Sequence, residues 1–178
     1  VKFNIITMVL KHSIFYYKFD AMQSLNQLLD IYGESHKNGT NKAIHWICVP
    51  SIMFSLTGLL MAIPFPIGET KSLIMNWGFV VFVFAWLYYL RLSTVMFVCF
   101  LAIGGLMLWG NLNLLHYFNS ESGLAICSII IFAAAWIGQF IGHAIEGKKP
   151  SFLQDLQFLL IGPAWLLHFV FDKYKIKY

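Results

Sequence analysis

Four runs of about 20 predominantly apolar residues constrain this chain more than any other feature of its sequence. They extend over Lys42–Ile63, Ser72–Leu90, Ser93–Phe118 and Gly123–Ile145. A helix of that length crosses the hydrocarbon layer of a bilayer, which is roughly 30 Å thick. The composition agrees, because 59% of the 178 residues are hydrophobic and only 11% are charged, too few to cover a water-soluble globule. The sequence therefore predicts an all-α integral membrane protein with four transmembrane helices.

The region before the first run, residues 1–35, has the pattern of an amphipathic helix. Asp20 is a candidate N-cap, Gln23 completes a capping box, and Gly33 is a typical helix end. Between them, apolar residues recur at helical intervals: Met22, Leu25, Leu28, Leu29 and Tyr32. We expect this helix to lie on the membrane surface.

The region after the last run is less regular. Residues 151–171 are apolar but include several polar side chains, and Pro163 is expected to interrupt a helix there. This pattern predicts an interfacial or re-entrant helical segment. No repeat or linker divides the chain, so we expect a single domain over 1–178 whose transmembrane helices occupy 42–145.

Charge sets the expected orientation. The formal net charge is +4, but no basic stripe interleaved with aromatic residues indicates nucleic-acid binding, and the basic residues are better suited to lipid phosphates. Lysine and arginine dominate the N-terminal segment, the short link at Arg91 and the pair Lys148 and Lys149. Since such loops remain in the cytoplasm, both termini are expected there.

The topology groups three of the six histidines. His36 and His45 flank the start of the first run, and His143 ends the fourth, so four crossings return it to the same membrane face. His116 falls on the opposite face. His168 joins the group only if the last segment folds back.

The spacing of the first two histidines requires a break in the helix. His36 and His45 are nine residues apart and would point in opposite directions on one continuous helix. Gly39 permits a break, and Thr40 or Asn41 is a natural N-cap. His36 is then on a loop that can fold back towards His45.

Polar side chains accompany these histidines at helical spacing. Asn41 is four residues before His45, and Gln139, His143 and Glu146 are separated by four and three residues. Polar groups at membrane depth are costly unless paired or bound, and imidazoles with polar partners are typical ligands of a transition metal. The alternative is that the histidines are interfacial and hydrogen-bonded to lipid or backbone. Spacing does not choose the metal.

Gly138 and Gly142 form a small-xxx-small pair just before His143. Such a pair lets another helix approach His143 closely, and the helix of the first run is a candidate.

Two motifs resemble the small membrane 2-hydroxy fatty acid dioxygenase family, which has a fungal member in the endoplasmic reticulum and many bacterial relatives. The resemblance covers about residues 32 to 163. The first motif is present as His36, Asn38, Asn41 and His45, and the second as Gln139, Phe140, Gly142, His143, Glu146 and Pro150. The fungal pattern has one more residue between the histidine and the glutamate, so Glu146 is not assigned as a ligand.

The resemblance implies an iron(II)-dependent dioxygenase that converts a long-chain 2-hydroxy fatty acid and O2 to a fatty acid one carbon shorter, as in the phytosphingosine breakdown served by the fungal enzyme. His36, His45 and His143 would hold Fe(2+), and Asn41, Gln139 and Glu146 would orient them. The protein would be in a bacterial inner membrane, in contact with membrane lipids, with its metal site near the cytoplasmic face.

Two other classes of protein are alternatives. A lipid hydroxylase or desaturase normally has several closely spaced histidine boxes, which this sequence lacks. A small non-enzymatic transporter or scaffold would favour inverted repeats or charged residues within the spans, whereas here the polar residues gather near one face.

Overall fold

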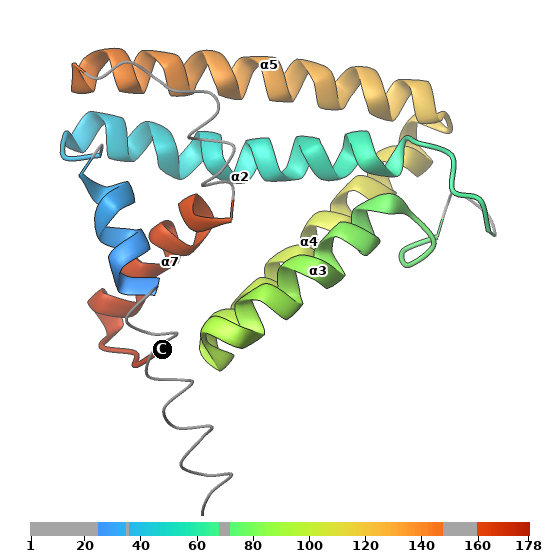
Figure 1. Ribbon diagram of the computed structural model, residues 1–178. Helices are drawn as coiled ribbons and strands as arrows, with labels where there is room; N and C mark the ends of the chain where they lie inside the picture. The colour runs from blue at the N-terminus through green and yellow to red at the C-terminus, as the bar shows by residue number, and fades with distance from the viewer. Residues whose placement is uncertain (1–24, 35, 68–71, 148–159) are drawn as a thin grey trace, which may run out of the picture.

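The computed structural model describes residues 25–34, 36–67, 72–147 and 160–178, and within them all regular structure is helical (Figure 1). Residues 25–33 are helical, and the helices that follow are α2 (Gly39–Met61), α3 (Trp77–Leu92), α4 (Thr94–Phe118), α5 (Glu121–Glu146) and α7 (Ile161–Tyr174). The predicted all-helical class is confirmed for this part of the chain.

α2 and α5 lie side by side and antiparallel, and they form the largest helix contact (Figure 1). Two glycines of α5 make this possible. A Cβ on Gly138 would be 2.6 Å from the Cys48 sulfur, and a Cβ on Gly142 would be 2.4 Å from Oδ1 of Asn41. The close approach that this glycine pair predicts is therefore confirmed, and its partner is the first long helix.

α3 and α4 form a tight antiparallel hairpin that runs obliquely to the α2 and α5 pair in Figure 1. Ser93 is the whole connection, and its hydroxyl accepts a hydrogen bond from the backbone N–H of Met96. Between the helices, the rings of Tyr89 and Phe100 stack with centroids 3.7 Å apart, and Trp86 donates to the Phe100 carbonyl at 2.9 Å.

α3 begins later than the apolar run that predicts it. The expected start is Ser72, but the helix starts at Trp77 because Asn76 caps it by accepting a hydrogen bond from the N–H of Phe79. The Asn76 amide also donates to the carbonyls of Ser72 and Leu73, which holds the preceding residues in a turn.

A buried polar contact joins α2, α4 and α5. Asn111 of α4 donates to the Phe54 carbonyl of α2 at 3.0 Å, and a Cβ on Gly58 would collide with both Asn111 and Ser128 of α5. Because Gly58 has no side chain, the three helices can approach one another closely at this point.

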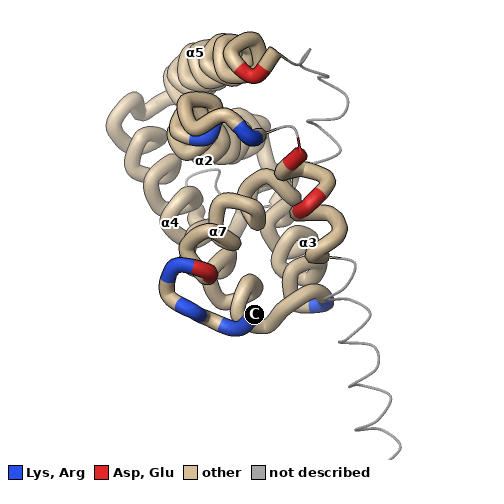
Figure 2. Tube along the Cα trace, turned by 90° about the vertical axis from the view of Figure 1, so that its left-hand side faces the viewer, with Lys and Arg blue, Asp and Glu red and all other residues tan. Residues whose placement is uncertain are grey.

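Three helices, α2, α4 and α5, are long and apolar enough to cross a membrane, whereas α3 is apolar but has only 16 residues. Large apolar side chains such as Phe84, Leu106 and Ile130 point outward and are more than 60% exposed. Among the described residues, the charged ones lie at or near helix ends and in the connecting segments (Figure 2). The molecule is therefore a membrane protein.

The two terminal helical regions pack against the start of α2. Leu25, Leu29 and Tyr32 are buried in a cluster with Trp165 of α7, which confirms one apolar face of the predicted N-terminal helix. The cap predicted at Asp20 and Gln23 is outside the described residues, as are residues 151–159 of the last segment.

Pro163 lies in the first turn of α7, which begins two residues before it, so the proline does not interrupt this helix. A proline in the first turn removes an N–H that has no intrahelical acceptor. The interruption predicted within 151–171 stays a prediction, because residues 151–159 are outside the described residues.

Candidate metal site

Three buried histidines from three parts of the chain meet at one end of the α2 and α5 pair. His36, His45 and His143 are exposed by only 2%, 1% and 4%, and one ring nitrogen of each lies within 4.8 Å of the others. Their ring centroids are 4.3 to 5.2 Å apart. The structure thus brings together the three histidines that topology groups.

A short loop delivers His36. Its backbone N–H donates to the Gly33 carbonyl at 3.0 Å, which turns the chain after the helical residues 25–33. α2 then starts at Gly39, capped by Asn38, whose side chain accepts from the N–H groups of Thr40 and Asn41. The predicted break is correct, but the caps predicted at Thr40 or Asn41 are wrong.

Hydrogen bonds fix which nitrogens of two histidines point inward. Nδ1 of His36 lies 2.7 Å from the Tyr32 carbonyl, and Nδ1 of His45 lies 2.9 Å from the Asn41 carbonyl. A carbonyl only accepts, so each Nδ1 carries its hydrogen, and in a neutral imidazole Nε2 then presents a lone pair. The two Nε2 atoms are 2.9 Å apart. Two lone pairs at that distance repel unless a proton or a metal cation lies between them.

Glu146 fastens the loop to the end of α5. Its carboxylate accepts hydrogen bonds from the backbone N–H groups of Lys37 and Asn38 and from the amide of Asn41, at 2.8 to 3.1 Å. The carboxylate therefore lies at the N-terminal end of α2, where the helix dipole is positive, and it satisfies hydrogen-bond donors near His36 and His45. Gln139 is buried one turn before His143 and faces His45.

Two residues of this site are not found by the sequence reasoning. The Tyr32 ring stacks on His36 at 4.3 Å, and the Trp165 ring of α7 is 5.1 Å from His36. For Tyr32, the spacing of four residues before His36 is a sequence signal that could have indicated this contact. Trp165 has none, because only long-range packing places it there.

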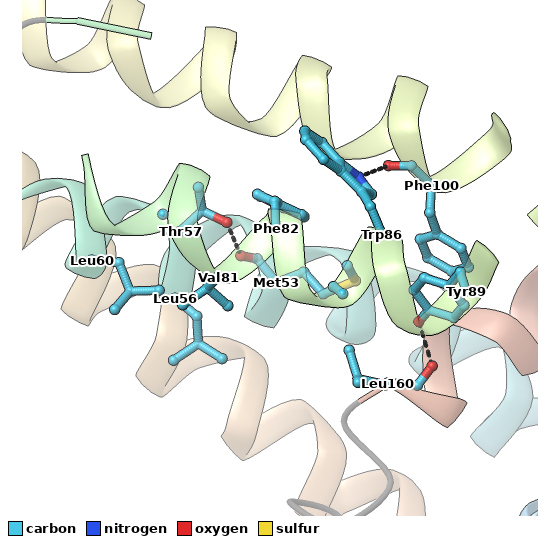
Figure 3. A pocket seen from close by; sticks show the side chains of 12 residues that line it. Met53, Leu56, Thr57, Leu60, Val81, Phe82, Trp86, Tyr89, Phe100 and Leu160 are labelled. Carbon is cyan, nitrogen blue, oxygen red and sulfur yellow. Dashed lines mark hydrogen bonds between the residues drawn. The ribbon is translucent and has the colours of Figure 1, made fainter. Parts of the chain in front are cut away.

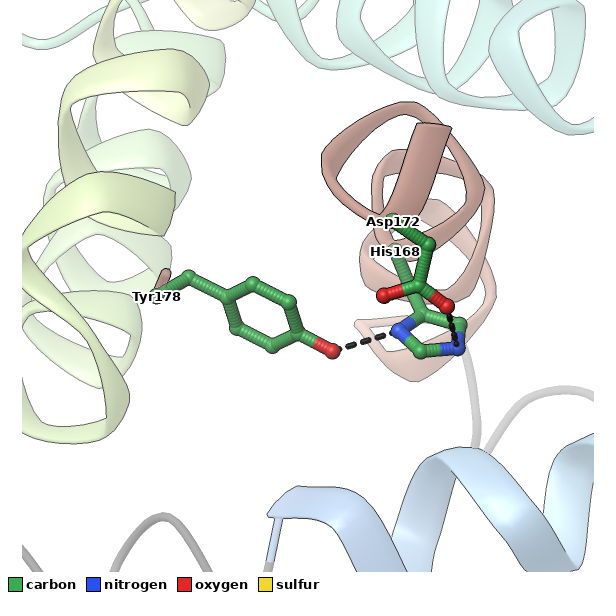
Figure 4. A network of polar contacts seen from close by, with 3 residues as sticks. All are labelled: His168, Asp172 and Tyr178. Carbon is green, nitrogen blue, oxygen red and sulfur yellow. Dashed lines mark hydrogen bonds and ion pairs between the residues drawn. The ribbon is translucent and has the colours of Figure 1, made fainter. Parts of the chain in front are cut away.

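The remaining histidines play other parts. In α7, Nε2 of His168 is 3.2 Å from the Asp172 carboxylate and Nδ1 contacts the Tyr178 hydroxyl, so both of its nitrogens are engaged (Figure 4). α7 contacts α2, yet His168 is not in the group of histidines that could hold a metal ion. His116 is exposed at the end of α4, and His12 is outside the described residues.

An apolar cavity of about 310 Å³ lies among α2, α3, α4 and the start of α7 (Figure 3). Met53 and Leu60 of α2, Val81 and Phe82 of α3, and Leu160 line it. Its walls are almost entirely hydrocarbon, so it suits an apolar ligand.

Comparison with known proteins gives the same family twice. Residues 22–174 match the family described as "2-hydroxy-palmitic acid dioxygenase Mpo1-like". The chain is also 31% identical over 155 residues to the 2-hydroxy-palmitic acid dioxygenase MPO1 of Saccharomyces cerevisiae. The matched region covers 83% of this chain and 80% of the yeast protein. No solved structure matches.

Proposed function

Because this chain belongs to the Mpo1-like family of 2-hydroxy-palmitic acid dioxygenases, we propose that it oxidises long-chain 2-hydroxy fatty acids with O2 and ferrous iron. The product is a fatty acid one carbon shorter, as the sequence motifs lead us to expect. The proposal includes both the metal and the substrate.

The main support for a bound metal is the geometry of His36 and His45. Their Nε2 atoms are 2.9 Å apart, and both Nδ1 atoms lie next to carbonyl oxygens. Nitrogen ligands lie about 2.0–2.1 Å from a bound divalent ion, and two neighbouring ligands of one ion are then separated by about 3 Å. The buried histidines therefore fit a metal, with His143 as the third ligand. Three histidines leave coordination positions for substrate, as non-haem iron chemistry requires.

In this proposal the neighbouring residues hold the ligands in place. The carbonyls of Tyr32 and Asn41 select the tautomer, and Glu146 and the Asn41 side chain fix the loop that carries His36. Bound iron would supply the redox chemistry with O2 and a Lewis acid for the hydroxyl and carboxylate oxygens of the substrate.

The proposed reaction needs no reductant other than the substrate. One 2-hydroxy acid and one O2 give the shortened acid, CO2 and water: the C1–C2 bond breaks, C2 becomes a carboxyl carbon and C1 leaves as CO2. All atoms and electrons are then accounted for.

We place the distal acyl chain in the apolar cavity. Met53 and Leu60 lie on the same side of α2 as His45. Met53 is eight residues beyond His45, about 12 Å along the helix, which is within reach of a long acyl chain whose carboxyl end is at the histidines.

The membrane arrangement is part of the same proposal. We infer that α3 crosses together with α4, which makes four crossings, and that the histidines lie near the cytoplasmic face of a bacterial inner membrane. The lysines near the start of α2 and the arginine at the end of α3 support this orientation. Reporter fusions at the two termini test it.

The direct test is turnover by the purified protein. We expect 2-hydroxypalmitate under air, with ferrous iron, to give pentadecanoate and CO2 detectable by mass spectrometry. With ¹⁸O2, label should enter the product carboxylate. Palmitate, which lacks the hydroxyl, is the control and should remain unchanged.

Replacing His36, His45 and His143 by alanine should remove both iron and activity. If the triple variant still turns over, or if the purified wild type binds no iron and never shortens the substrate, the proposal is wrong.

A further inference from the structure

A second cavity, of about 360 Å³, opens at the surface beside the histidines. It is bounded by the helical residues 25–33, the loop before α2, the first turn of α2 and α7. The lining residues used below are His36, Lys37, Lys42, Trp165, His168 and Phe169. Of the three grouped histidines, His36 is the one in its wall, so the cavity leads from the surface to the cluster.

Lys42 is placed to serve this cavity. It is three residues before His45 in α2 and therefore on the same side of the helix. Its side chain is half-buried and its Nζ is 5.5 Å from the centroid of the Phe169 ring of α7. Among the described residues, no carboxylate lies within 4 Å of that ammonium. It is a partly desolvated cation, and such a group favours an anion.

The other charged groups of the cavity restrict where an anion can bind. Asp30 and Glu34 also line it and disfavour an anion near them. Asp30 lies towards Tyr178: burial and then the carboxylates of Asp172 and Asp30 raise the pKa of the Tyr178 hydroxyl. Asp172 is itself engaged with His168 (Figure 4). The cationic part of the cavity is thus its α2 side, where Lys42 and Lys37 line it beside the neutral ring of His36.

We infer that this cavity binds the carboxylate end of an amphiphilic 2-hydroxy acid, with Lys42 as its main cation and with Trp165 and Phe169 against the first carbons of the chain. The inference rests on the proposed function for the identity of the ligand. It assigns Lys42 a substrate-binding role that the histidines do not fill. A carboxylate bound beside His36 would lie next to the Lys42 ammonium of α2.

The test compares an acid with its uncharged ester. Binding of 2-hydroxypalmitate and of its methyl ester is measured on the protein in lipid nanodiscs, without metal. The wild type should bind the acid about 10-fold or more tightly than the ester. Lys42→Met should lose this preference and Lys42→Arg should keep it. Lys173→Met, which removes an exposed lysine of α7, is the matched control and should behave as wild type.

Kinetics then separate binding from chemistry. With iron, Lys42→Met should raise KM for the acid about 10-fold, with kcat within about twofold of wild type and with unchanged iron content. A merely structural role for Lys42 would lower iron content or kcat together with binding.

The outcomes distinguish this inference from the proposed function. If the wild type does not turn over the acid but Lys42 still determines the preference for acid over ester, the cavity is correct and the reaction is wrong. If wild type binds acid and ester equally, the inference is overturned whatever the activity, and this holds even if Lys42→Met fails to fold. If wild type and a folded Lys42→Met variant show the same preference for acid over ester, the inference is overturned too.

Discussion

The histidine end of the molecule and the apolar cavity next to α3 are built in opposite ways. At the histidine end, hydrogen bonds hold the loop before α2 and two of the three histidines: Glu146 accepts from three donors, and the Nδ1 atoms of His36 and His45 face backbone carbonyls. Around the cavity, the lining side chains such as those of Met53 and Val81 are apolar, and about 310 Å³ is left unfilled.

The difference indicates a division of labour. Hydrogen bonds have preferred distances and directions, so the polar end fixes atoms to within a fraction of an ångström. Apolar contact has no direction and tolerates changes of shape and volume. In the proposed function, a rigid set of histidines and an adaptable chain-binding region would suit an enzyme that acts on one head group and accepts varied acyl chains.

The largest effect should come from removing a proposed metal ligand. We expect His45→Ala to lower turnover of 2-hydroxypalmitate at least about 1,000-fold, because loss of even an outer partner costs 10- to 100-fold. Met53→Ala, on the same side of α2 in the cavity, should change it only a few-fold. Iron content by mass spectrometry and product formation check both. Similar losses in the two variants would remove the functional distinction between the regions.

The second test adds a single methyl group where the histidine end has no room. A Cβ at Gly142 would be 2.4 Å from Oδ1 of Asn41, and Asn41 cannot move without losing Glu146. We expect Gly142→Ala to cost about 2–3 kcal/mol in stability, as overpacking usually does, and to weaken iron binding.

Gly105→Ala of α4 is the control for that substitution. No atom lies within 4 Å of its added Cβ, so alanine should be neutral or stabilising by up to about 1 kcal/mol. Thermal unfolding in detergent measures both variants. Equal melting temperatures would show that the α2 and α5 contact is not tight.

Much of the histidine end is predictable because spacing and topology determine it. From their positions at the start of the first apolar run and the end of the fourth, His45 and His143 are expected close together, and Gly138 and Gly142 predict the close helix contact. What the sequence misses depends on competition between neighbours. The sequence suggests the Asn41 side chain as the partner of His45, but that side chain is engaged by Glu146, so the Asn41 backbone carbonyl takes its place.

The cap of α2 shows the same limit. Asn38, Thr40 and Asn41 all have suitable side chains, and local propensity does not separate them. Glu146 decides, because it accepts the Lys37 and Asn38 N–H groups from a helix more than 100 residues later in the chain. The contact of Trp165 with His36 is equally non-local.

A smaller effect is expected when Glu146 keeps its shape but loses its charge. In Glu146→Gln one oxygen becomes an NH₂ group that faces a donor, either the Asn41 amide or a backbone N–H. We expect iron affinity to fall about 10-fold, the lower range for a residue that supports ligands, with the helices intact. Glu121→Gln, at the other end of α5, should leave iron affinity unchanged. An unchanged affinity in Glu146→Gln would mean that the loop holds His36 without this carboxylate.

The smallest effect, with the opposite sign, should come from adding carbon to the cavity. Ala85 of α3 lines it, and leucine adds three carbons in a direction that is not occupied. Filling an apolar space recovers dispersion contacts, so we expect Ala85→Leu to raise stability by about 0.5–1 kcal/mol, typical of cavity-filling changes. Iron content should not change, because the histidine site lies at the N-terminal part of α2, away from the cavity. Turnover of long 2-hydroxy acids should fall relative to that of short ones, since the distal chain loses volume. A variant that is destabilised as much as Gly142→Ala would show that the cavity is packed as tightly as the histidine end, and one that handles all chain lengths like wild type would place the acyl chain elsewhere.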